Sequence, residues 1–75
     1  MKVEDIIIQY WITERDRDSG ESSIHIPSGE TEDDIVEEAK QMFLNYNYAA
    51  VEVIYEEEED VIYHISNTIP KGERY

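Results

Sequence analysis

The chain has 75 residues, of which 19 are acidic and 6 are basic, so its formal net charge is −13. A chain of this length forms one small domain, which hides only about 60% of its unfolded surface. The absence of cysteine excludes disulfides and thiolate metal sites. The shortage of lysine and arginine argues against direct binding to nucleic acid or to an anionic membrane surface.

The start of the chain predicts a cytoplasmic protein. Acidic residues Glu4 and Asp5 follow the first residues at once, and a secretory signal peptide does not begin in this way. No apolar run approaches the roughly 20 residues of a membrane-spanning helix. High net charge also suits a disordered chain, but 40% of the residues are hydrophobic and they recur in periodic blocks, which predicts folding.

Residues 4–26 predict two strands joined by a turn. In residues 4–13, β-branched and aromatic side chains alternate between two faces, one of which carries Ile6, Ile8, Tyr10 and Ile12. Residues 14–21 contain no apolar side chain, so we expect a turn at the tip of a hairpin. In residues 22–26 we expect Ile24 and Ile26 to face the core and His25 to face away, and Pro27 ends this strand.

Residues 32–46 predict an amphipathic helix. Thr31 is a suitable N-cap, and three acidic residues in the first turn match the helix dipole. Asn47 tolerates the left-handed conformation that ends many helices. The apolar positions follow one helical face and are Ile35, Val36, Ala39, Met42, Phe43 and Tyr46.

Residues 48–55 and 61–66 predict a second pair of strands around an acidic tip at residues 56–60. The order β-β-α-β-β predicts an α+β fold, with a four-stranded, mainly antiparallel sheet and one helix packed on one face. We assign this domain to residues 1–67 and expect residues 68–75 to be a loosely ordered tail. The strand residues expected to face the helix are Ile6, Ile8, Ile24, Ile26, Val51, Val53, Val61 and Ile65.

The second face of the sheet is left uncovered in this arrangement, and it is partly apolar. We expect it to form a homodimer interface, because a second subunit supplies buried area that a domain of this size lacks. The alternatives are an interface with a different partner and a few tolerated exposed apolar side chains. The residues of the predicted interface are Ile7, Trp11, Ile54 and Ile62.

The sequence predicts no catalytic residue, metal site or cofactor. Residues 16–21 are similar to the start of a calcium loop, but Gly20 falls at the fifth position rather than the sixth, and the flanks are predicted strands. His25 and His64 are the only histidines, and neither lies near a nucleophile turn or a glycine-rich phosphate loop. We therefore predict that the protein is not an enzyme.

The acidic residues are concentrated in one stretch of the sequence. Between Asp18 and Asp60 there are 14 acidic residues and one basic residue, so this stretch alone carries a net charge of −13. The remaining segments balance, with 5 acidic and 5 basic residues. A small domain needs a net charge of only about 2–8 in magnitude for solubility, so we expect part of this charge to have a function.

The acidic side chains are suited to bind a basic partner. Carboxylates three or four residues apart on a helix lie about 5–6 Å apart, and alternate strand positions lie about 6–7 Å apart, so rows of them can imitate a phosphate backbone. Two alternatives stay open, a merely solvated surface and an antitoxin-like module whose basic partner is unrelated to DNA. The predicted partner-binding residues are Glu32, Asp33, Asp34, Glu37, Glu38, Glu52, Glu56, Glu57, Glu58, Glu59 and Asp60.

In its small size, lack of cysteine and concentrated acidity, the chain resembles phage-encoded DNA-mimic proteins. Such proteins inhibit host DNA-binding proteins, among them histone-like HU nucleoid proteins, restriction enzymes, CRISPR nucleases and uracil-DNA glycosylase. The resemblance covers the profile of the whole chain and the acidic stretch 18–60, without a diagnostic motif. It implies an inhibitor in the host cytoplasm that occupies a partner's DNA-binding surface. HU is the leading target, because a dimeric mimic would match its symmetry.

Overall fold

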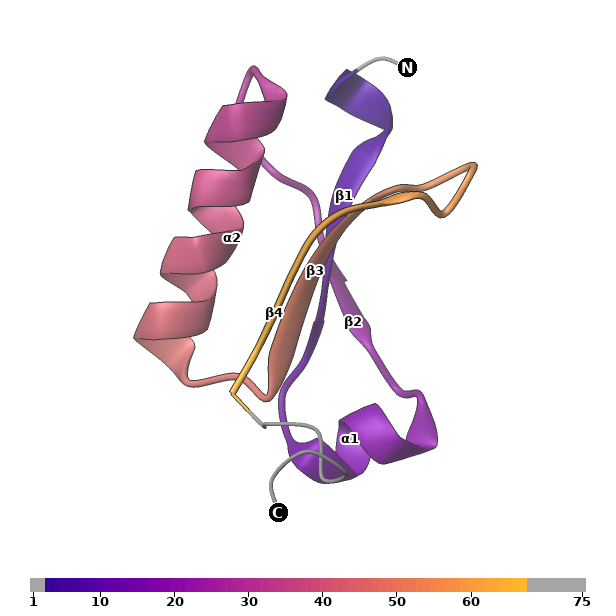
Figure 1. The fold of residues 1–75 in the computed structure, drawn as a ribbon, viewed down its shortest axis with the longest axis vertical. Helices are drawn as coiled ribbons and strands as arrows, with labels where there is room; N and C mark the ends of the chain where they lie inside the picture. Colours follow the sequence, from indigo (N-terminus) through magenta and orange to yellow (C-terminus); the bar gives the residue numbers. More distant parts are fainter. Residues whose placement is uncertain (1–2, 68–75) are drawn as a thin grey trace.

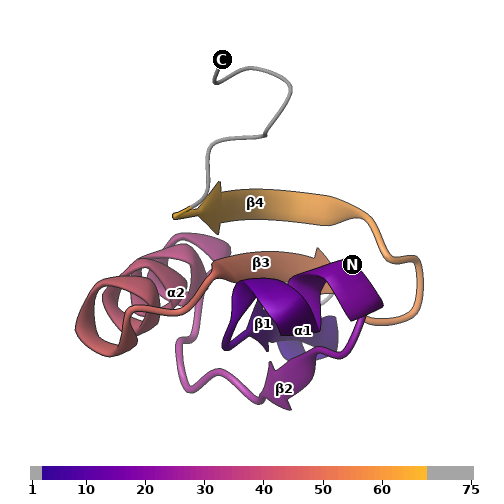
Figure 2. The ribbon, with the colours of Figure 1, turned by 90° about the horizontal axis from the view of Figure 1, so that it is seen from below.

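The structure, a computed structural model, describes residues 3–67, in which a four-stranded antiparallel sheet carries a long helix on one face (Figure 1). The strands lie in the order β2-β1-β3-β4, as the end-on view shows (Figure 2). This confirms the predicted α+β fold. The predicted tail at residues 68–75 lies outside the described residues. In chain order the elements are the 3-10 helix η1 (Val3–Asp5), β1 (Ile6–Trp11), α1 (Glu14–Ser19), β2 (Ser23–His25), α2 (Glu32–Tyr46), β3 (Ala50–Tyr55) and β4 (Val61–Ser66).

Helix α2 begins and ends where the sequence predicts. The Thr31 hydroxyl accepts a hydrogen bond from the Asp34 backbone N–H at 3.1 Å, which satisfies one of the free donors of the first turn. At the other end Asn47 adopts a left-handed conformation (φ 53°), and its N–H donates to the Phe43 carbonyl at 3.1 Å. Local capping chemistry therefore sets both ends of this helix.

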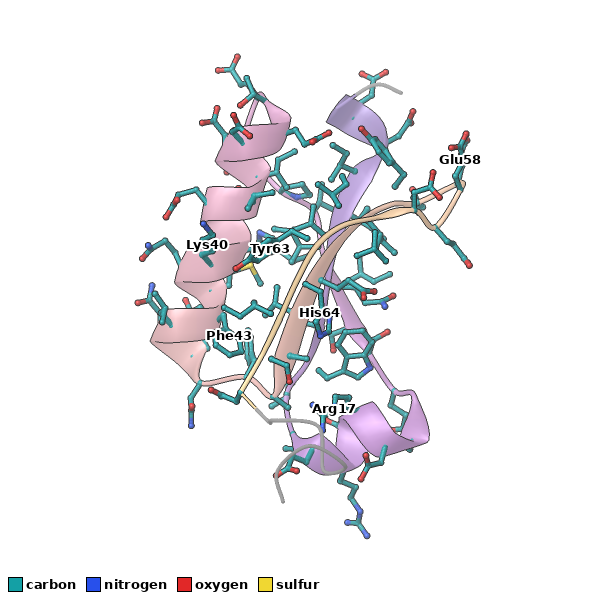
Figure 3. The ribbon with its side chains drawn as sticks, viewed as in Figure 1. Arg17, Lys40, Phe43, Glu58, Tyr63 and His64 are labelled. Atoms are coloured by element: carbon teal, nitrogen blue, oxygen red, sulfur yellow. The ribbon has the colours of Figure 1, made fainter. Side chains whose placement is uncertain are left out.

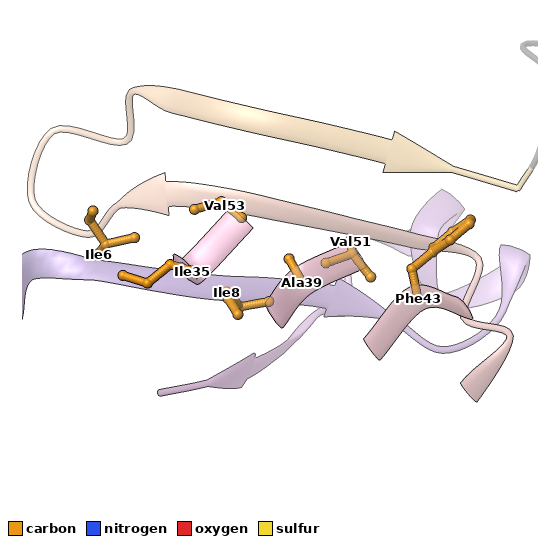
Figure 4. Close-up of a cluster of buried hydrophobic side chains, with 7 residues drawn as sticks. All are labelled: Ile6, Ile8, Ile35, Ala39, Phe43, Val51 and Val53. Carbon is orange, nitrogen blue, oxygen red and sulfur yellow. The ribbon is translucent and has the colours of Figure 1, made fainter. Parts of the chain in front are cut away.

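The core lies between α2 and the two central strands (Figure 4). Ala39 is fully buried at the middle of the helix face, and its small side chain lets the helix backbone approach the sheet closely. Burial of this apolar surface contributes about 25 cal/mol for each Å² removed from water. The seven buried residues of the cluster are Ile6, Ile8, Ile35, Ala39, Phe43, Val51 and Val53.

The apolar face predicted for the helix wrongly includes Tyr46 at its C-terminal end. Tyr46 is 64% exposed and does not enter the core. Its ring stacks instead on Tyr48, with centroids 5.4 Å apart, and Tyr48 stacks on Tyr10 at 4.6 Å. Burial, and then the neighbouring tyrosines, raise the pKa of the Tyr48 hydroxyl. The stacked rings cover the core where the helix has ended.

The turn predicted at residues 14–21 is wrong, because residues 14–19 form the short helix α1. The Thr13 hydroxyl caps its first turn by accepting from the Asp16 N–H at 3.1 Å. The N–H groups of Gly20 (φ 79°) and Glu21 donate to the carbonyls of Arg17 and Asp16, which is the Schellman arrangement. The segment has no apolar stripe, so its helical signal lay only in these two caps.

The two faces of β2 are the reverse of those predicted. Ile8 belongs to the core, and its direct partner across the sheet is His25, so His25 lies on the helix side. Ile24 pairs with Gln9 on the outer face and is 55% exposed. The two alternating sets of side chains in β2 were predicted correctly, but the apolar set, which includes Ile24, was wrongly expected to face the core. In this three-residue edge strand, the helix side is occupied instead by His25, which pairs with the carboxylate of Glu38 on α2.

A bulge also reverses part of β4. Tyr63 pairs with Val53 on the helix side, but the register then shifts, and Val61 pairs with Ile54 on the outer face. A shift of one residue moves each following side chain to the opposite face. Val61, predicted in the core, is therefore 55% exposed, and Ile62, predicted on the outer face, packs against the core.

Shortening a core side chain should measurably lower the stability of this small domain. Ile35 is fully buried in α2, so we expect Ile35→Val to lower the free energy of unfolding by about 1 kcal/mol. Ile24→Val, the same substitution at a half-exposed position, should change it by less than about 0.5 kcal/mol. Urea unfolding of both variants at pH 7 measures the difference, and equal losses would contradict the assigned core.

Candidate binding surface

Three acidic segments meet at one end of the molecule. The 3-10 helix η1, the first turn of α2 and the turn between β3 and β4 all lie at the end opposite α1 (Figure 1). The hairpin row of carboxylates and the first-turn part of the helix row therefore lie at the same end of the molecule. We call this end the acidic pole, and its residues are Glu4, Asp5, Glu30, Glu32, Asp33, Asp34, Glu56, Glu57, Glu58, Glu59 and Asp60.

Two contacts join the segments of the acidic pole. The Tyr55 hydroxyl donates to the Glu32 carboxylate at 2.9 Å, which connects the end of β3 to the first turn of α2. The Glu56 N–H donates to the Asp5 carbonyl at 2.9 Å, which connects the hairpin turn to the start of β1. The bond to Glu32, and then burial and the nearby acidic charges, raise the pKa of Tyr55.

Negative charge at the acidic pole is not balanced locally. All of its side chains are exposed except Asp5, which is half-buried. The basic residues of the described chain lie elsewhere, since Arg15 and Arg17 are on α1 and Lys40 lies 5.5 Å from the centre of the Tyr63 ring. The separation of Glu58 at one end from Arg17 at the other is visible in Figure 3. The charge is thus distributed unevenly along the molecule.

Three predicted partner-binding residues lie outside the acidic pole. Glu37 is exposed one turn further along α2, where the Gln41 side chain donates to its carboxylate at 3.3 Å. Glu38 lies against His25 of β2, and Glu52 lies 3.3 Å from the His64 ring on the outer face of the sheet. The carboxylates of Glu38 and Glu52 are therefore engaged within the fold.

The Glu38 carboxylate holds the loop between β2 and α2. It accepts from the backbone N–H groups of Ser28 at 3.0 Å and Gly29 at 3.2 Å, and it lies 2.8 Å from the His25 Nε2 atom. Burial of the carboxyl raises its pKa, but the hydrogen bonds from His25 and Ser28 and the charge of His25 outweigh this, so the pKa of Glu38 is below its ordinary value. No motif or spacing in the sequence indicates this role of Glu38.

The two histidines do not form a catalytic pair. His25 lies on the helix side of the sheet and His64 on the outer face, and each is paired with its own carboxylate. Nucleophilic catalysis needs a base within hydrogen-bond reach of a nucleophile and a third group that orients the base. The contacts of His25 and His64 connect strands and helix, which is a structural role.

The predicted dimer residues do not make one exposed patch. Ile7 and Ile54 share the outer face but are only 5% and 7% exposed, and Trp11, at the other end of β1 on the same face, is half-buried. Ile62 packs against the core on the other side of the sheet. The bulge in β4 accounts for the position of Ile62.

Residues Glu4, Asp5 and Glu30 belong to the acidic pole although the sequence did not single them out. Glu4 and Asp5 lie near the start of the chain, in residues 1–17, which hold four acidic and three basic residues and so have a net charge of only −1. Only the return of β3 beside β1 brings that segment next to the acidic hairpin. No sequence signal reports such a meeting of distant segments.

Comparison with known proteins gives no further assignment. No family model matches the sequence, and neither the curated proteins nor the solved structures contain a match. Within residues 3–67, no cluster of three or more side chains suited to a metal ion is found. No helix in this part of the chain has the length and apolar character needed to cross a membrane.

Removing the charge of Glu38 should loosen the loop between β2 and α2. Because its pKa is lowered in the folded state, the stabilisation by Glu38 is present above its unfolded pKa of about 4.3 and is lost as pH falls through the folded value. We expect Glu38→Gln to lower the free energy of unfolding at pH 7 by about 1 kcal/mol. The difference from the unmodified protein should shrink below about pH 4.

The matched control is Glu37→Gln, which removes the same charge from the exposed neighbouring position and should change stability by less than about 0.5 kcal/mol. Urea unfolding between pH 3 and pH 7 measures both variants. A pH-independent loss in Glu38→Gln would show that its charge is not what stabilises the loop.

Proposed function

We propose that this protein is a non-enzymatic DNA mimic that inhibits a DNA-binding protein by occupying its DNA-binding surface, with a histone-like HU protein as the leading target. The observation that supports this is the acidic pole, where exposed carboxylates of a helix and a hairpin lie at the same end of the molecule. The partner's lysine and arginine residues, which otherwise contact phosphates, would supply the affinity.

The contacts within the acidic pole favour binding of a basic surface over mere solvation. The bond between Tyr55 and Glu32 and the bond between Glu56 and Asp5 hold the carboxylate-bearing segments in a fixed relation. A fixed array of charges loses less conformational entropy on binding than a flexible tail. The helix dipole also favours the negative charges in the first turn of α2.

The uneven charge distribution favours one orientation of approach. The acidic pole is attracted to a positive surface and would face it, while the arginines of α1 lie at the opposite end (Figure 3). Complementary fields of this kind accelerate association and make it strongly dependent on salt. A basic partner unrelated to DNA would share this salt dependence, so only competition with DNA separates the two functions.

Competition with DNA is the direct test of the proposal. We expect the protein to displace a fluorescently labelled duplex from purified HU in low salt, and to lose this ability at about 0.5 M salt as charges are screened. Fluorescence anisotropy of the duplex measures the displacement. Binding to HU without release of DNA, or no binding in low salt, would contradict DNA mimicry of this target.

Neutralising the hairpin tip should weaken the displacement of DNA. The triple variant Glu57→Gln, Glu58→Gln, Asp60→Asn removes three charges from the acidic pole, and we expect it to raise the concentration needed for displacement by about tenfold. The matched control, Glu14→Gln, Asp18→Asn, Glu21→Gln, removes three exposed charges near α1 and should change it by less than about threefold. Equal effects of the two triple variants on DNA displacement would show that the binding surface does not lie at the acidic pole.

The homodimer in this proposal would form through the edge of β4. This strand lies at one end of the sheet order, is six residues long, and has none of the lysine or proline residues that protect edge strands. Antiparallel pairing of two β4 strands places the two acidic tips at opposite ends of the joined sheets, which limits their repulsion. Such a dimer would present two acidic poles to a dimeric partner.

A lysine on the outer face of β4 should break this dimer. We expect Val61→Lys to convert the dimer to a monomer, because a charged side chain on an edge strand disfavours pairing. Ile24→Lys is a close control, since Ile24 is equally exposed, at 55%, on the outer face of the opposite edge strand β2. Light scattering coupled to size-exclusion chromatography gives the masses. A monomeric unmodified protein would exclude the dimer.

A further inference from the structure

A pocket with an apolar floor and an acidic rim opens within the acidic pole. It has a volume of 460 Å³ and lies between the start of β1, the loop after β2 and the first turns of α2. Ile6 and Ile35, which are neighbours in the core, form its floor (Figure 4). The exposed carboxylates of Glu4 and Glu30 stand at its rim on two different segments.

The loop wall of this pocket is held in place before any ligand binds. Glu38 accepts from the N–H groups of Ser28 and Gly29, the two residues that precede Glu30. Gly29 also packs tightly against α2, because a Cβ atom there would lie 2.9 Å from the Asp34 Cβ and 3.0 Å from the Ile35 nitrogen. These contacts hold the backbone of the two residues that precede Glu30.

The apolar side of the pocket is incomplete in the isolated protein. Ile26 lines the pocket and is 72% exposed, and Pro27 lies next to it. An exposed isoleucine beside two carboxylates suits a ligand that is apolar along its length and cationic at its tip. Arginine and lysine side chains have this form, since their methylene stems cover apolar surface while the charged head stays near water or a carboxylate.

We propose that this pocket receives a single arginine side chain from the basic partner, an inference that rests on the proposed function. The stem lies on Ile26 and Pro27, and the guanidinium lies between the carboxylates of Glu4 and Glu30. Arginine fits better than lysine, because its planar fork can donate to two carboxylates at once and it is enriched at protein interfaces. The volume of 460 Å³ leaves ample room for one arginine side chain.

Two variants that each lose two charges test whether the pocket contributes to binding beyond its effect on the net charge. Glu4→Gln, Glu30→Gln removes two charges at the pocket rim, and Glu57→Gln, Glu58→Gln removes two charges at the hairpin tip. We expect the rim variant to weaken binding to HU by about tenfold and the tip variant by about threefold, since a partly desolvated arginine–carboxylate contact is stronger than an exposed one. Equal losses of affinity for HU in the two variants at the same salt concentration would overturn the proposal that this pocket binds arginine.

A peptide titration tests the pocket without the partner protein. The probes are acetyl-Gly-Arg-Gly-amide and the same peptide with citrulline, which keeps the shape of arginine but lacks its charge. We expect the arginine peptide to cause saturable NMR shifts of the Ile6, Gly29 and Ile35 amides, and the citrulline peptide to cause less than a third of those shifts. Shifts confined to residues 56–60, or equal for both peptides, would overturn the proposal.

The outcomes of the two experiments distinguish a failure of the pocket proposal from a failure of the proposed function. Displacement of DNA from HU together with equal losses in the rim and tip variants would retain the proposed function and overturn the pocket. Absence of binding to HU together with saturable shifts from the arginine peptide would retain the pocket as an arginine site and overturn the choice of HU. The Glu4→Gln, Glu30→Gln protein serves as the control in the titration, where its shifts should be lost.

Discussion

The packing of α2 against β1 and β3 is the interaction on which the rest of the structure depends. Within residues 3–67, α2 is the only long helix that can cover the apolar face of the sheet, and Ile35, Ala39 and Phe43 make this contact. Because Ala39 is small, the helix lies close to the strands. Capping sets where the helix begins, and this packing then places its acidic first turn near the end of β3, where Tyr55 donates to Glu32.

The structure divides the acidic residues into two kinds with different physical roles. Glu38 and Glu52 are paired with histidines, and Glu38 also binds backbone N–H groups, so these carboxylates stabilise the fold. The carboxylates of the acidic pole are mostly exposed and repel one another, which lowers stability. A surface that costs stability in a small domain is reasonably explained by a partner of opposite charge, and the proposed function rests on this division.

The errors in the predicted faces have one physical origin. Alternation along a strand defines two sets of side chains, but the neighbouring strands decide which set faces the core. In β2 the register with β1 places His25 beside Ile8, and in β4 the bulge moves Val61 outward and Ile62 inward. Residue type could not reveal either event, because both depend on backbone pairing between segments distant in the sequence.

The amino-acid sequence was enough to predict the α+β class, the ends of α2 and the extent of β4, and it carries the strong bias toward acidic residues. These follow from local rules such as capping, periodicity and composition. Only the tertiary structure decided which carboxylates are used internally, and that Glu4 and Glu30 share a pocket rim with an apolar floor. The reason is that a charged side chain acquires its role from its neighbours in space, and those neighbours come from strand pairing and helix packing.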